Sequence, residues 1–373
     1  MTCSLFGGHF AGRRVLVTGH TGFKGSWLSE WLLTLGADVI GYALEAPTEP
    51  SLFEELGLEG RMRSVVGDVR DLQRLREVFG AERPEIVFHL AAQPLVRLSY
   101  DEPVDTYATN VMGTVNVLEA IRHTPGVRVA VMVTSDKCYE NRETGQAYAE
   151  DDPLGGYDPY SSSKACAELV TSAYRRSFFG EGAETRIASV RAGNVIGGGD
   201  WALDRIVPDC VRALESGVPI TVRNPDAVRP WQHVLEPLSG YLLLASRMWS
   251  GGHEFDGAWN FGPREHGTVP VRRVVEAMIG GWGSGSWDHP DGIRSVHEAN
   301  LLALDIAKAR EILGWAPIHS IERTFATTAA WYGARHRGAD VRTITDDDIS
   351  RYVDDARRLG AVWTTTGQES AEE

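Results

Sequence analysis

The sequence feature that most strongly constrains the fold is a predicted buried strand followed by a glycine-rich turn and then a helix. Residues 14–19 form a short apolar run, and residues 26–35 place tryptophans and leucines at helical spacing. Gly19, Gly22 and Gly25 lie between them with the spacing GxxGxxG. This differs by one residue from the GxGxxG fingerprint of dinucleotide-binding proteins but meets the same needs. One glycine allows the tight turn, one the approach of a pyrophosphate, and one the packing of helix against sheet.

The turn predicts a dinucleotide site. The amino end of the helix offers free backbone N–H groups, which favour phosphate, whereas a glycine-rich turn without a ligand is the alternative. We expect cofactor contacts from Gly19, Thr21, Gly22, Phe23, Lys24 and Gly25. The carboxylate that usually holds the adenosine ribose is missing from the end of the second predicted strand, because Asp38 begins that strand. No pair of arginines replaces it, which favours NAD over NADP.

Strands and helices alternate through the first half of the chain. Strands are predicted at residues 14–19, 38–44, 63–69, 86–91, 129–135 and 186–193, and helices at 26–35, 71–80, 103–123 and 159–178. This alternation predicts parallel βαβ units, and so an α/β fold with a doubly wound, Rossmann-type sheet. We expect a dinucleotide-binding domain over residues 1–193, with returns from about 223–245. A smaller, mixed α/β substrate-binding cap is expected over 194–340, interleaved with the sheet, and a C-terminal helix and acidic tail over 341–373.

Charge and composition exclude several classes of partner. The 373 residues carry 51 acidic and 37 basic side chains, a net charge of -14, which disfavours a broad basic surface for nucleic acid or an anionic membrane. No apolar run has the length of a membrane span. The four cysteines, Cys3, Cys138, Cys166 and Cys210, lack the spacing of a metal site. We therefore expect a reduced, cytoplasmic protein without a metal, in which local groups bind any anionic ligand.

Tyr160 and Lys164 form a YxxxK pair within a predicted helix. Residues four apart lie on one helical face, so both side chains can reach one ligand. A free phenol titrates near ~10, and a neighbouring lysine cation favours the phenolate and lowers that pKa. An exposed helix face is the alternative. Because the pair lies downstream of the glycine turn, a catalytic role is favoured over an exposed helix face.

Longer motifs identify a family resemblance. The chain resembles the extended short-chain dehydrogenases/reductases through TGHTGFKG, GDVRD, FHLAAQ, TNVMGT, YxxxK and RAGNVIG, in that order. More narrowly it is similar to the CDP-glucose 4,6-dehydratases, through GHTGFKGSWL, GYALEAPTEPSLFE, HLAAQPLVRLSY, TSDKCYEN, GGYDPYSSSK, SVRAGNVIGGGDWA and RPWQHVLEPLSGY. The likeness covers roughly Arg14 to Trp331.

The resemblance implies a redox-neutral reaction of CDP-glucose with one bound NAD. Hydride leaves sugar C4, water is lost across C5 and C6, and the hydride returns to C6, giving CDP-4-keto-6-deoxyglucose. Tyr160 would remove the 4-hydroxyl proton, Lys164 would hold the nicotinamide ribose and lower the pKa of Tyr160, and Ser135 would hydrogen-bond the 4-oxygen. The resemblance also implies a homodimer or homotetramer that pairs through helices flanking the sheet.

Asp136 and Lys137 mark a departure from the dTDP-glucose relatives, which have Asp-Glu at these positions. There the Asp protonates the leaving hydroxyl and the Glu takes the C5 proton. Lys137 can be that base only if burial or a nearby cation depresses its pKa. Otherwise it stabilises the enolate while another group removes the proton. Both roles stay open, and a solvated turn after the strand is the alternative to either.

The resemblance extends to further ligand contacts. It implies cofactor contacts from Asp68, Val69, Leu90, Ala91, Ala92, Gln93, Asn110 and Arg191, and nucleotide-sugar contacts from Asn194, Arg205, Arg229 and Asn260. Arginine suits planar recognition of phosphate. Asn110 is a poor helix former within a predicted helix, which suggests a structural or proton-relay hydrogen bond. His89 lies in a predicted buried strand and is interpreted as a hydrogen-bonded core residue.

Other functions remain as alternatives. A nucleotide-sugar 4-epimerase would use Tyr160 and NAD but would need no acid or base at 136 and 137. A dehydratase acting on dTDP- or UDP-glucose is a second alternative. A dinucleotide-sensing regulator would bind the cofactor without turnover, and would have no use for Ser135, Tyr160 and Lys164 together.

Overall fold

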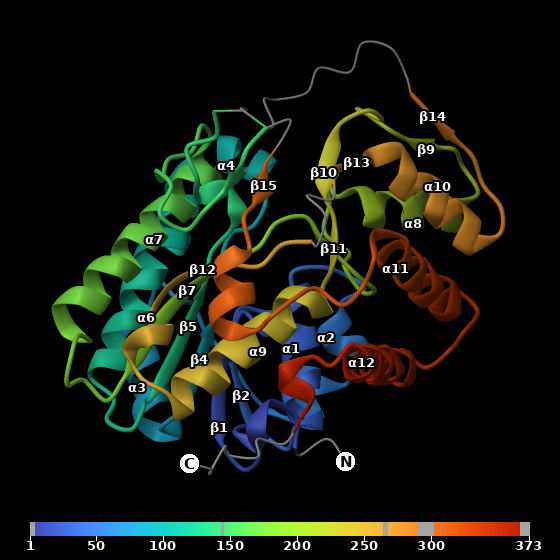
Figure 1. Cartoon of the computed structure of the whole chain (residues 1–373). Coiled ribbons are helices and arrows are strands. Elements are labelled where there is room, and N and C mark those ends of the chain that lie inside the picture. The colour runs from blue at the N-terminus through green and yellow to red at the C-terminus, as the bar shows by residue number, and fades with distance from the viewer. Residues whose placement is uncertain (1–3, 143–144, 264–267, 290–301, 366–373) are drawn as a thin grey trace.

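A seven-stranded parallel sheet forms the centre of the molecule (Figure 1). The computed structural model describes residues 4–142, 145–263, 268–289 and 302–365. The strand order is β12-β7-β5-β4-β1-β2-β3, so the order reverses between β1 and β4. This confirms the predicted α/β fold with a doubly wound sheet. The strands are β1 (Arg14–Thr18), β2 (Asp38–Ala43), β3 (Arg63–Val66), β4 (Ile86–His89), β5 (Val129–Val133), β7 (Arg186–Arg191) and β12 (Gly257–Asn260).

Helices cover both faces of the sheet (Figure 1). Val15 and Val17 of β1 belong to one core cluster with Trp27 and Trp31, while Leu16 between them belongs to the cluster on the other face. This alternation is the period of two expected of a strand buried on both sides. The covering helices are α1 (Phe23–Thr34), α3 (Leu72–Glu82), α5 (Pro103–Tyr107), α6 (Gly113–Arg122), α7 (Pro159–Phe178) and α9 (Leu235–Ser250).

The rest of the chain builds small two-stranded sheets and helices beside the main sheet. The strand pairs are β10 with β13, β11 with β8, β14 with β9 and β15 with β6. These strands are β6 (Ala147–Tyr148), β8 (Val195–Ile196), β9 (Ile220–Thr221), β10 (Val228–Pro230), β11 (Gln232–His233), β13 (Thr268–Pro270), β14 (Trp287–Asp288) and β15 (Ala303–Leu304). The remaining helices are α2 (Leu52–Glu55), α4 (Val96–Asp101), α8 (Ile206–Ser216), α10 (Val271–Trp282), α11 (Ile321–His336) and α12 (Val341–Arg358).

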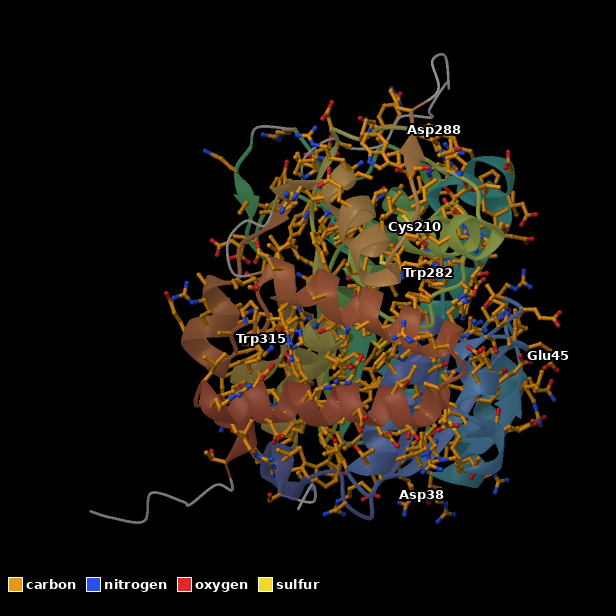
Figure 2. All side chains as sticks on the ribbon, turned by 90° about the vertical axis from the view of Figure 1, so that its right-hand side faces the viewer. Asp38, Glu45, Cys210, Trp282, Asp288 and Trp315 are labelled. Carbon is orange, nitrogen blue, oxygen red and sulfur yellow. The ribbon has the colours of Figure 1, made fainter. Side chains whose placement is uncertain are left out.

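The chain returns to the main sheet through α9, which begins within the expected range of about 223–245, and then through β12, which pairs with β7. The C-terminal helix expected after residue 340 is α12. Figure 2 shows α11 and α12 side by side across one side of the molecule. The predicted acidic tail lies outside the described residues. No helix of the described ranges is both long and apolar enough to span a membrane.

Several elements end earlier than their sequence patterns predicted. β5 ends at Val133, and Ser135 then caps a 3-10 turn, Asp136–Cys138, by accepting a hydrogen bond from the backbone of Lys137.

The predicted helix 103–123 is divided by a π-helical turn, Ala108–Met112, between α5 and α6. Such turns insert a residue into a helix and are frequent at functional sites.

Candidate active site

The predicted site residues follow the carboxyl ends of four neighbouring strands. Residues 19–25 follow β1, 90–93 follow β4, 135–137 follow β5, and Asn194 comes after β7. In open parallel sheets this edge binds ligands where the strand order reverses, here between β1 and β4. Asp38 lies at the opposite edge, where β2 begins, and Figure 2 shows it at the bottom of the molecule, away from Glu45. Asp38 therefore does not reach a cofactor at the carboxyl edge.

The glycine turn folds as its spacing predicts. Gly19 has a φ of +72°, and a Cβ there would lie 2.7 Å from the backbone nitrogen of Ala91. A Cβ on Gly25 would overlap the carbonyl oxygen of Gly19, so helix and turn pack through bare backbone. Gly22 is the N-cap of α1 and provides no side-chain cap, while Thr21 donates to the carbonyl oxygen of Leu44 at 3.0 Å. The open helix end has the free N–H groups that a dinucleotide pyrophosphate requires.

Thr18 and His89 hold the loop that follows β4. The Thr18 hydroxyl oxygen accepts hydrogen bonds from the backbone nitrogens of Leu90 and Ala91, at 3.1 and 3.2 Å. It also lies 2.7 Å from Nδ1 of His89, and burial lowers the pKa of this histidine to about 3. The other ring nitrogen is 3.3 Å from the hydroxyl of Thr114. The interpretation of His89 as a hydrogen-bonded core residue is therefore confirmed.

Asn110, in the π-helical turn, joins this loop to α7. Its Oδ1 accepts from the backbone nitrogen of Gln93 at 2.8 Å, and its Nδ2 donates to the Gln93 carbonyl oxygen at 3.1 Å. The same Nδ2 donates to the hydroxyl of Ser163 at 2.8 Å. Asn110 thus makes a structural hydrogen-bond link between Leu90–Gln93 and the helix that carries Tyr160. Ala92 lies in the same loop and is partly buried.

Tyr160 and Lys164 lie in the first two turns of α7. Asp158 caps this helix by accepting from the backbone nitrogen of Ser161 at 2.9 Å, and Pro159 occupies its first turn. Lys164 Nζ donates to the carbonyl oxygen of Val133 at 3.4 Å, which fixes its ammonium near the end of β5. Both side chains are buried, Tyr160 being 8 % exposed and Lys164 6 %.

Burial dominates the acidity of this pair. It raises the pKa of Tyr160 to about 12, although a hydrogen bond with Ser135 and the charge of Arg205 act in the opposite direction. Burial likewise lowers the pKa of Lys164 to about 8. Desolvation therefore outweighs the predicted lowering of the phenol pKa. The spacing of residues in the sequence gives no information about desolvation.

Asp136 lies beside this pair as a buried carboxyl group, 3 % exposed. Ser135 Oγ donates to Asp136 Oδ1 at 2.9 Å. Gly193 packs against the carboxylate so closely that a Cβ at position 193 would overlap it. Burial raises the pKa of Asp136, opposed first by the charge of Lys137. A carboxyl group in this environment can carry a proton at a higher pH than usual, as a general acid must.

Arg191 is occupied beneath the site by an ion pair. Its Nη2 lies 2.8 Å from Oε2 of Glu168, and its Nη1 donates to the hydroxyl of Tyr139 at 2.6 Å. The side chains of both Arg191 and Glu168 are 3 % exposed, so the structure does not bring Arg191 to the predicted cofactor surface. Sequence reasoning missed Glu168, although it continues the Tyr160 and Lys164 face of α7 at the same spacing of four.

The predicted substrate residues divide into two groups. Arg205 pairs with Asp200 at 2.9 Å, and its charge acts on Tyr160, so it lies near the reacting groups. Asn260 is fully buried, and its amide binds Tyr139 and the carbonyl oxygen of Tyr148, both at 2.8 Å. Its side chain is therefore joined through Tyr139 to Arg191.

The other two predicted substrate residues, Asn194 and Arg229, are partly buried. Asn194 has a φ of +48°, and its carbonyl oxygen accepts from the backbone of Gln232 at 3.2 Å. Arg229, on β10, donates to the carbonyl oxygen of Val228 at 2.9 Å.

Past the end of β3, Asp68 pairs with Arg70 at 2.7 Å, and Val69 is buried against Gly113. The resemblance implies a cofactor contact from each of these two residues.

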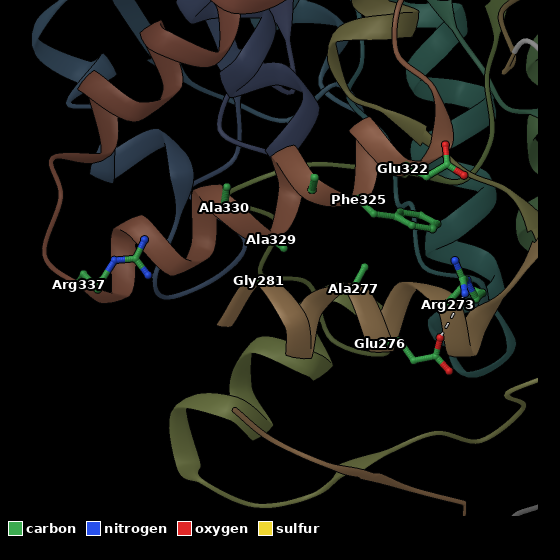
Figure 3. Close-up of a pocket in the computed structure, with 10 residues that line it drawn as sticks. Arg273, Glu276, Ala277, Gly281, Glu322, Phe325, Ala329, Ala330 and Arg337 are labelled. Carbon is green, nitrogen blue, oxygen red and sulfur yellow. Dashed lines mark ion pairs between the residues drawn. The ribbon is translucent and has the colours of Figure 1, made fainter. Parts of the chain in front are cut away.

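A separate cleft lies between α10 and α11 (Figure 3). Its volume is about 530 Å³, and its walls include Phe325, Ala277 and Ala329, with Arg273 and Glu276 at one end. None of its lining residues belongs to the predicted active site. We assign the chemistry to the strand ends instead.

The comparisons with known proteins are consistent with one another. Residues 15–262 match the NAD dependent epimerase/dehydratase family. The chain is 52 % identical to a CDP-glucose 4,6-dehydratase of Salmonella typhimurium, over 92 % of this chain and 96 % of that protein. Among solved structures it is similar to a dTDP-glucose 4,6-dehydratase of Streptomyces venezuelae with NAD bound, with a TM-score of 0.73, 26 % identity, and coverage of 87 % and 98 %. A UDP-glucose 4-epimerase of Thermus thermophilus in complex with NAD gives a TM-score of 0.74 and 26 % identity, with coverage of 87 % and 99 %.

Proposed function

This chain belongs to the NAD dependent epimerase/dehydratase family, and we propose that it is an NAD-dependent hydro-lyase that converts CDP-glucose to CDP-4-keto-6-deoxyglucose. The identity to the Salmonella enzyme extends over nearly the whole of both chains, which supports the same substrate class, a nucleotide sugar. NAD fits the open amino end of α1, where Gly22 leaves the backbone N–H groups uncapped. Bound NAD would accept the hydride of sugar C4 and later return it to C6.

Side chains of the protein transfer the protons that accompany this hydride transfer. Tyr160 takes the proton of the 4-hydroxyl, and Ser135 hydrogen-bonds the 4-oxygen. Lys164 holds the nicotinamide ribose, and its ammonium favours ionisation of the phenol. Asp136 donates its proton to the 6-hydroxyl as that group leaves, a role that suits its burial and raised pKa.

One observation carries this proposal over the alternatives: Asp136, a buried carboxyl group whose pKa is raised by burial, lies in the same buried site as Tyr160. A 4-epimerase uses the tyrosine alone and needs no acid for a leaving hydroxyl. A dinucleotide sensor needs neither group. The preference for cytidine over thymidine or uridine rests on the identity to the Salmonella enzyme.

Incubation with CDP-glucose and NAD in D₂O tests this function. We expect loss of one water and one deuterium at C5 of the 4-keto product, measured by NMR and mass spectrometry. CDP-glucose is expected to give a higher kcat/KM than dTDP- or UDP-glucose. A product with the galacto configuration would identify an epimerase, and no turnover of any of the three sugars would favour a sensor.

We also propose a homodimer or homotetramer that assembles through the helices flanking the sheet. Val104 on α5 is 78 % exposed and Leu169 on α7 57 %, and Met112 of the π-helical turn between α5 and α6 is also exposed. Apolar side chains exposed on neighbouring helices favour association. Light scattering of the purified protein is expected to give two or four times the chain mass of 40.9 kDa, and a monomer at micromolar concentration would contradict the proposal.

A further inference from the structure

Three buried polar side chains meet at neighbouring strand ends, beside the turn that carries Asp136. Tyr139 comes after β5, Arg191 ends β7 and Asn260 ends β12, and these strands are adjacent in the sheet (Figure 1). Arg191 and Asn260 are partners in the register of their two strands. Each of the three is at most 3 % exposed. We call these three residues the Tyr139 cluster.

The Tyr139 hydroxyl joins the members of this cluster. It accepts a hydrogen bond from Nη1 of Arg191 at 2.6 Å and donates one to Oδ1 of Asn260 at 2.8 Å. Burial raises the pKa of Tyr139, so the hydroxyl keeps the proton that it donates. Asn260 also donates to the carbonyl oxygen of Asp305 at 3.1 Å. The hydroxyl is therefore fixed from two sides by side chains of the sheet.

Tyr139 also ends the 3-10 turn that begins with Asp136. It is the C-cap of the turn Asp136–Cys138, and its backbone nitrogen donates to the carbonyl oxygen of Asp136 at 3.4 Å. Ser135 caps the other end. A turn of three residues has few hydrogen bonds of its own, so its orientation depends on the residues at its two ends. The position of the Tyr139 side chain therefore bears directly on the position of Asp136.

The end of β7 forms the other side of the Asp136 carboxyl group. Gly193 comes two residues after Arg191, and a Cβ at position 193 would overlap the carboxylate. The carboxyl group thus lies between its own turn and the segment that follows β7. The hydrogen bond between Tyr139 and Arg191 joins these two segments. Its loss should allow them to move relative to each other.

The function of Asp136 as an acid depends on its position. Burial raises its pKa, and the positive charges of Lys137 and Lys24 oppose that effect. Interactions between charges change with distance, so a displaced carboxyl group would hold its proton differently. The proton must also point at the leaving oxygen, and misplacement by about 1 Å can cost about 10²-fold in rate.

We propose that Tyr139 is a positioning residue for the elimination step, a role that rests on the proposed dehydratase function. Its hydroxyl, held by Arg191 and Asn260, orients the turn so that the Asp136 carboxyl group faces the 6-hydroxyl that leaves as water. The tyrosine and lysine assigned to C4 oxidation lie on another element, α7. C4 oxidation should therefore survive the loss of this hydroxyl, whereas elimination should not.

Tyr139→Phe removes the hydroxyl and keeps the buried ring. Arg191 retains its ion pair with Glu168 and its hydrogen bond to the carbonyl oxygen of Glu150 at 3.0 Å, so the guanidinium stays paired. We expect kcat for CDP-glucose to fall by roughly 10–10²-fold, because Asp136 is misplaced. Steady-state formation of the 4-keto product measures this loss.

Two substrate analogues separate elimination from oxidation. CDP-6-deoxyglucose has no leaving group at C6, so NADH absorbance in a single turnover of the holoenzyme reports C4 oxidation alone. Tyr139→Phe should oxidise this analogue within a few-fold of the wild-type rate. CDP-6-deoxy-6-fluoroglucose loses fluoride as an anion and needs no proton from Asp136, so with it the defect of Tyr139→Phe should largely disappear. Asp136→Asn should respond to both analogues in the same way.

Tyr148→Phe is the matched control. The Tyr148 ring stacks on the Tyr139 ring, with centroids 5.1 Å apart and planes at 21°. Its hydroxyl accepts from the backbone nitrogen of Arg142 at 2.8 Å and donates to Oδ1 of Asn141 at 3.1 Å. The same chemical change is thus made in the neighbouring ring, and wild-type rates are expected with all three sugars. Thermal unfolding and NAD affinity show whether each variant is folded.

Three outcomes overturn the inference. The first is a wild-type kcat for CDP-glucose in Tyr139→Phe. The second is an equal loss with CDP-glucose and CDP-6-deoxyglucose, which would give Tyr139 a general structural role. The third is a loss that is undiminished with the fluoro analogue, which would show that Tyr139 does not act through Asp136. The dehydratase function is judged separately, by turnover of CDP-glucose by the wild-type enzyme.

Discussion

Replacing Tyr160 by phenylalanine is expected to lower kcat for CDP-glucose by roughly 10²–10⁴-fold, the range measured for the loss of a general acid–base group. The substitution removes one hydroxyl from a ring that is 8 % exposed and leaves the ring packing of α7 in place. The 4-hydroxyl proton then has no acceptor near Ser135. Steady-state formation of the 4-keto product measures the loss.

Binding and folding should survive this change. NAD affinity, measured by quenching of tryptophan fluorescence, is expected to stay within a few-fold of wild type, because the glycine turn and Lys164 are untouched. The thermal midpoint should also be similar. Wild-type turnover in Tyr160→Phe would reject the site, whereas a variant that no longer binds NAD would give Tyr160 a structural role instead.

Replacing Glu168 by glutamine is expected to destabilise the fold by about 3–5 kcal/mol, the cost of leaving one partner of a buried ion pair alone. Glu168 Oε2 lies 2.8 Å from Arg191 Nη2, and the carboxylate also accepts hydrogen bonds from Thr134 and Ser189. The amide keeps the shape but not the charge, so the Arg191 guanidinium remains buried without compensation. Urea denaturation followed by circular dichroism measures the change in the free energy of unfolding.

Matched substitutions test the cause of that loss. Glu77→Gln makes the same chemical change in an exposed pair with Arg74, whose N–O distance is 3.2 Å, and should alter stability by less than about 0.5 kcal/mol. Combining Glu168→Leu with Arg191→Met removes both charges and should cost less than Glu168→Gln alone. Equal stability of Glu168→Gln and wild type would show that this ion pair does not hold the site together.

The Glu168 variant should also change the response to acid. Burial alone would raise the pKa of Glu168, but Arg191 and the hydrogen bonds more than offset it, so the pKa is lowered. A carboxylate with a lowered folded-state pKa contributes stability above its unfolded pKa of about 4.3 and loses it as pH falls through the folded value. The wild type should therefore lose stability below about pH 4 more steeply than Glu168→Gln.

Local patterns were sufficient to predict the first part of the fold. The predicted helix 159–178 has the observed bounds of α7, because Asp158 and Pro159 mark its start in the sequence itself. Strand ends were less predictable. The predicted strand 129–135 ends at Val133, since a hydrogen bond from Lys137 to Ser135 closes a 3-10 turn there. That bond competes with the strand in a way that residue propensities do not capture.

The sequence by itself determined the glycine turn and the YxxxK face, because each depends on residues within a few positions of one another. The alternation of strand and helix patterns along the chain also predicted the parallel βαβ units. Only the tertiary structure decided the rest. It committed Arg191 to Glu168, raised the pKa of Tyr160 through burial, and brought Lys24 to Asp136 across more than a hundred residues. Desolvation and charge depend on distances in space between distant segments, and so they appear only once the strands lie side by side.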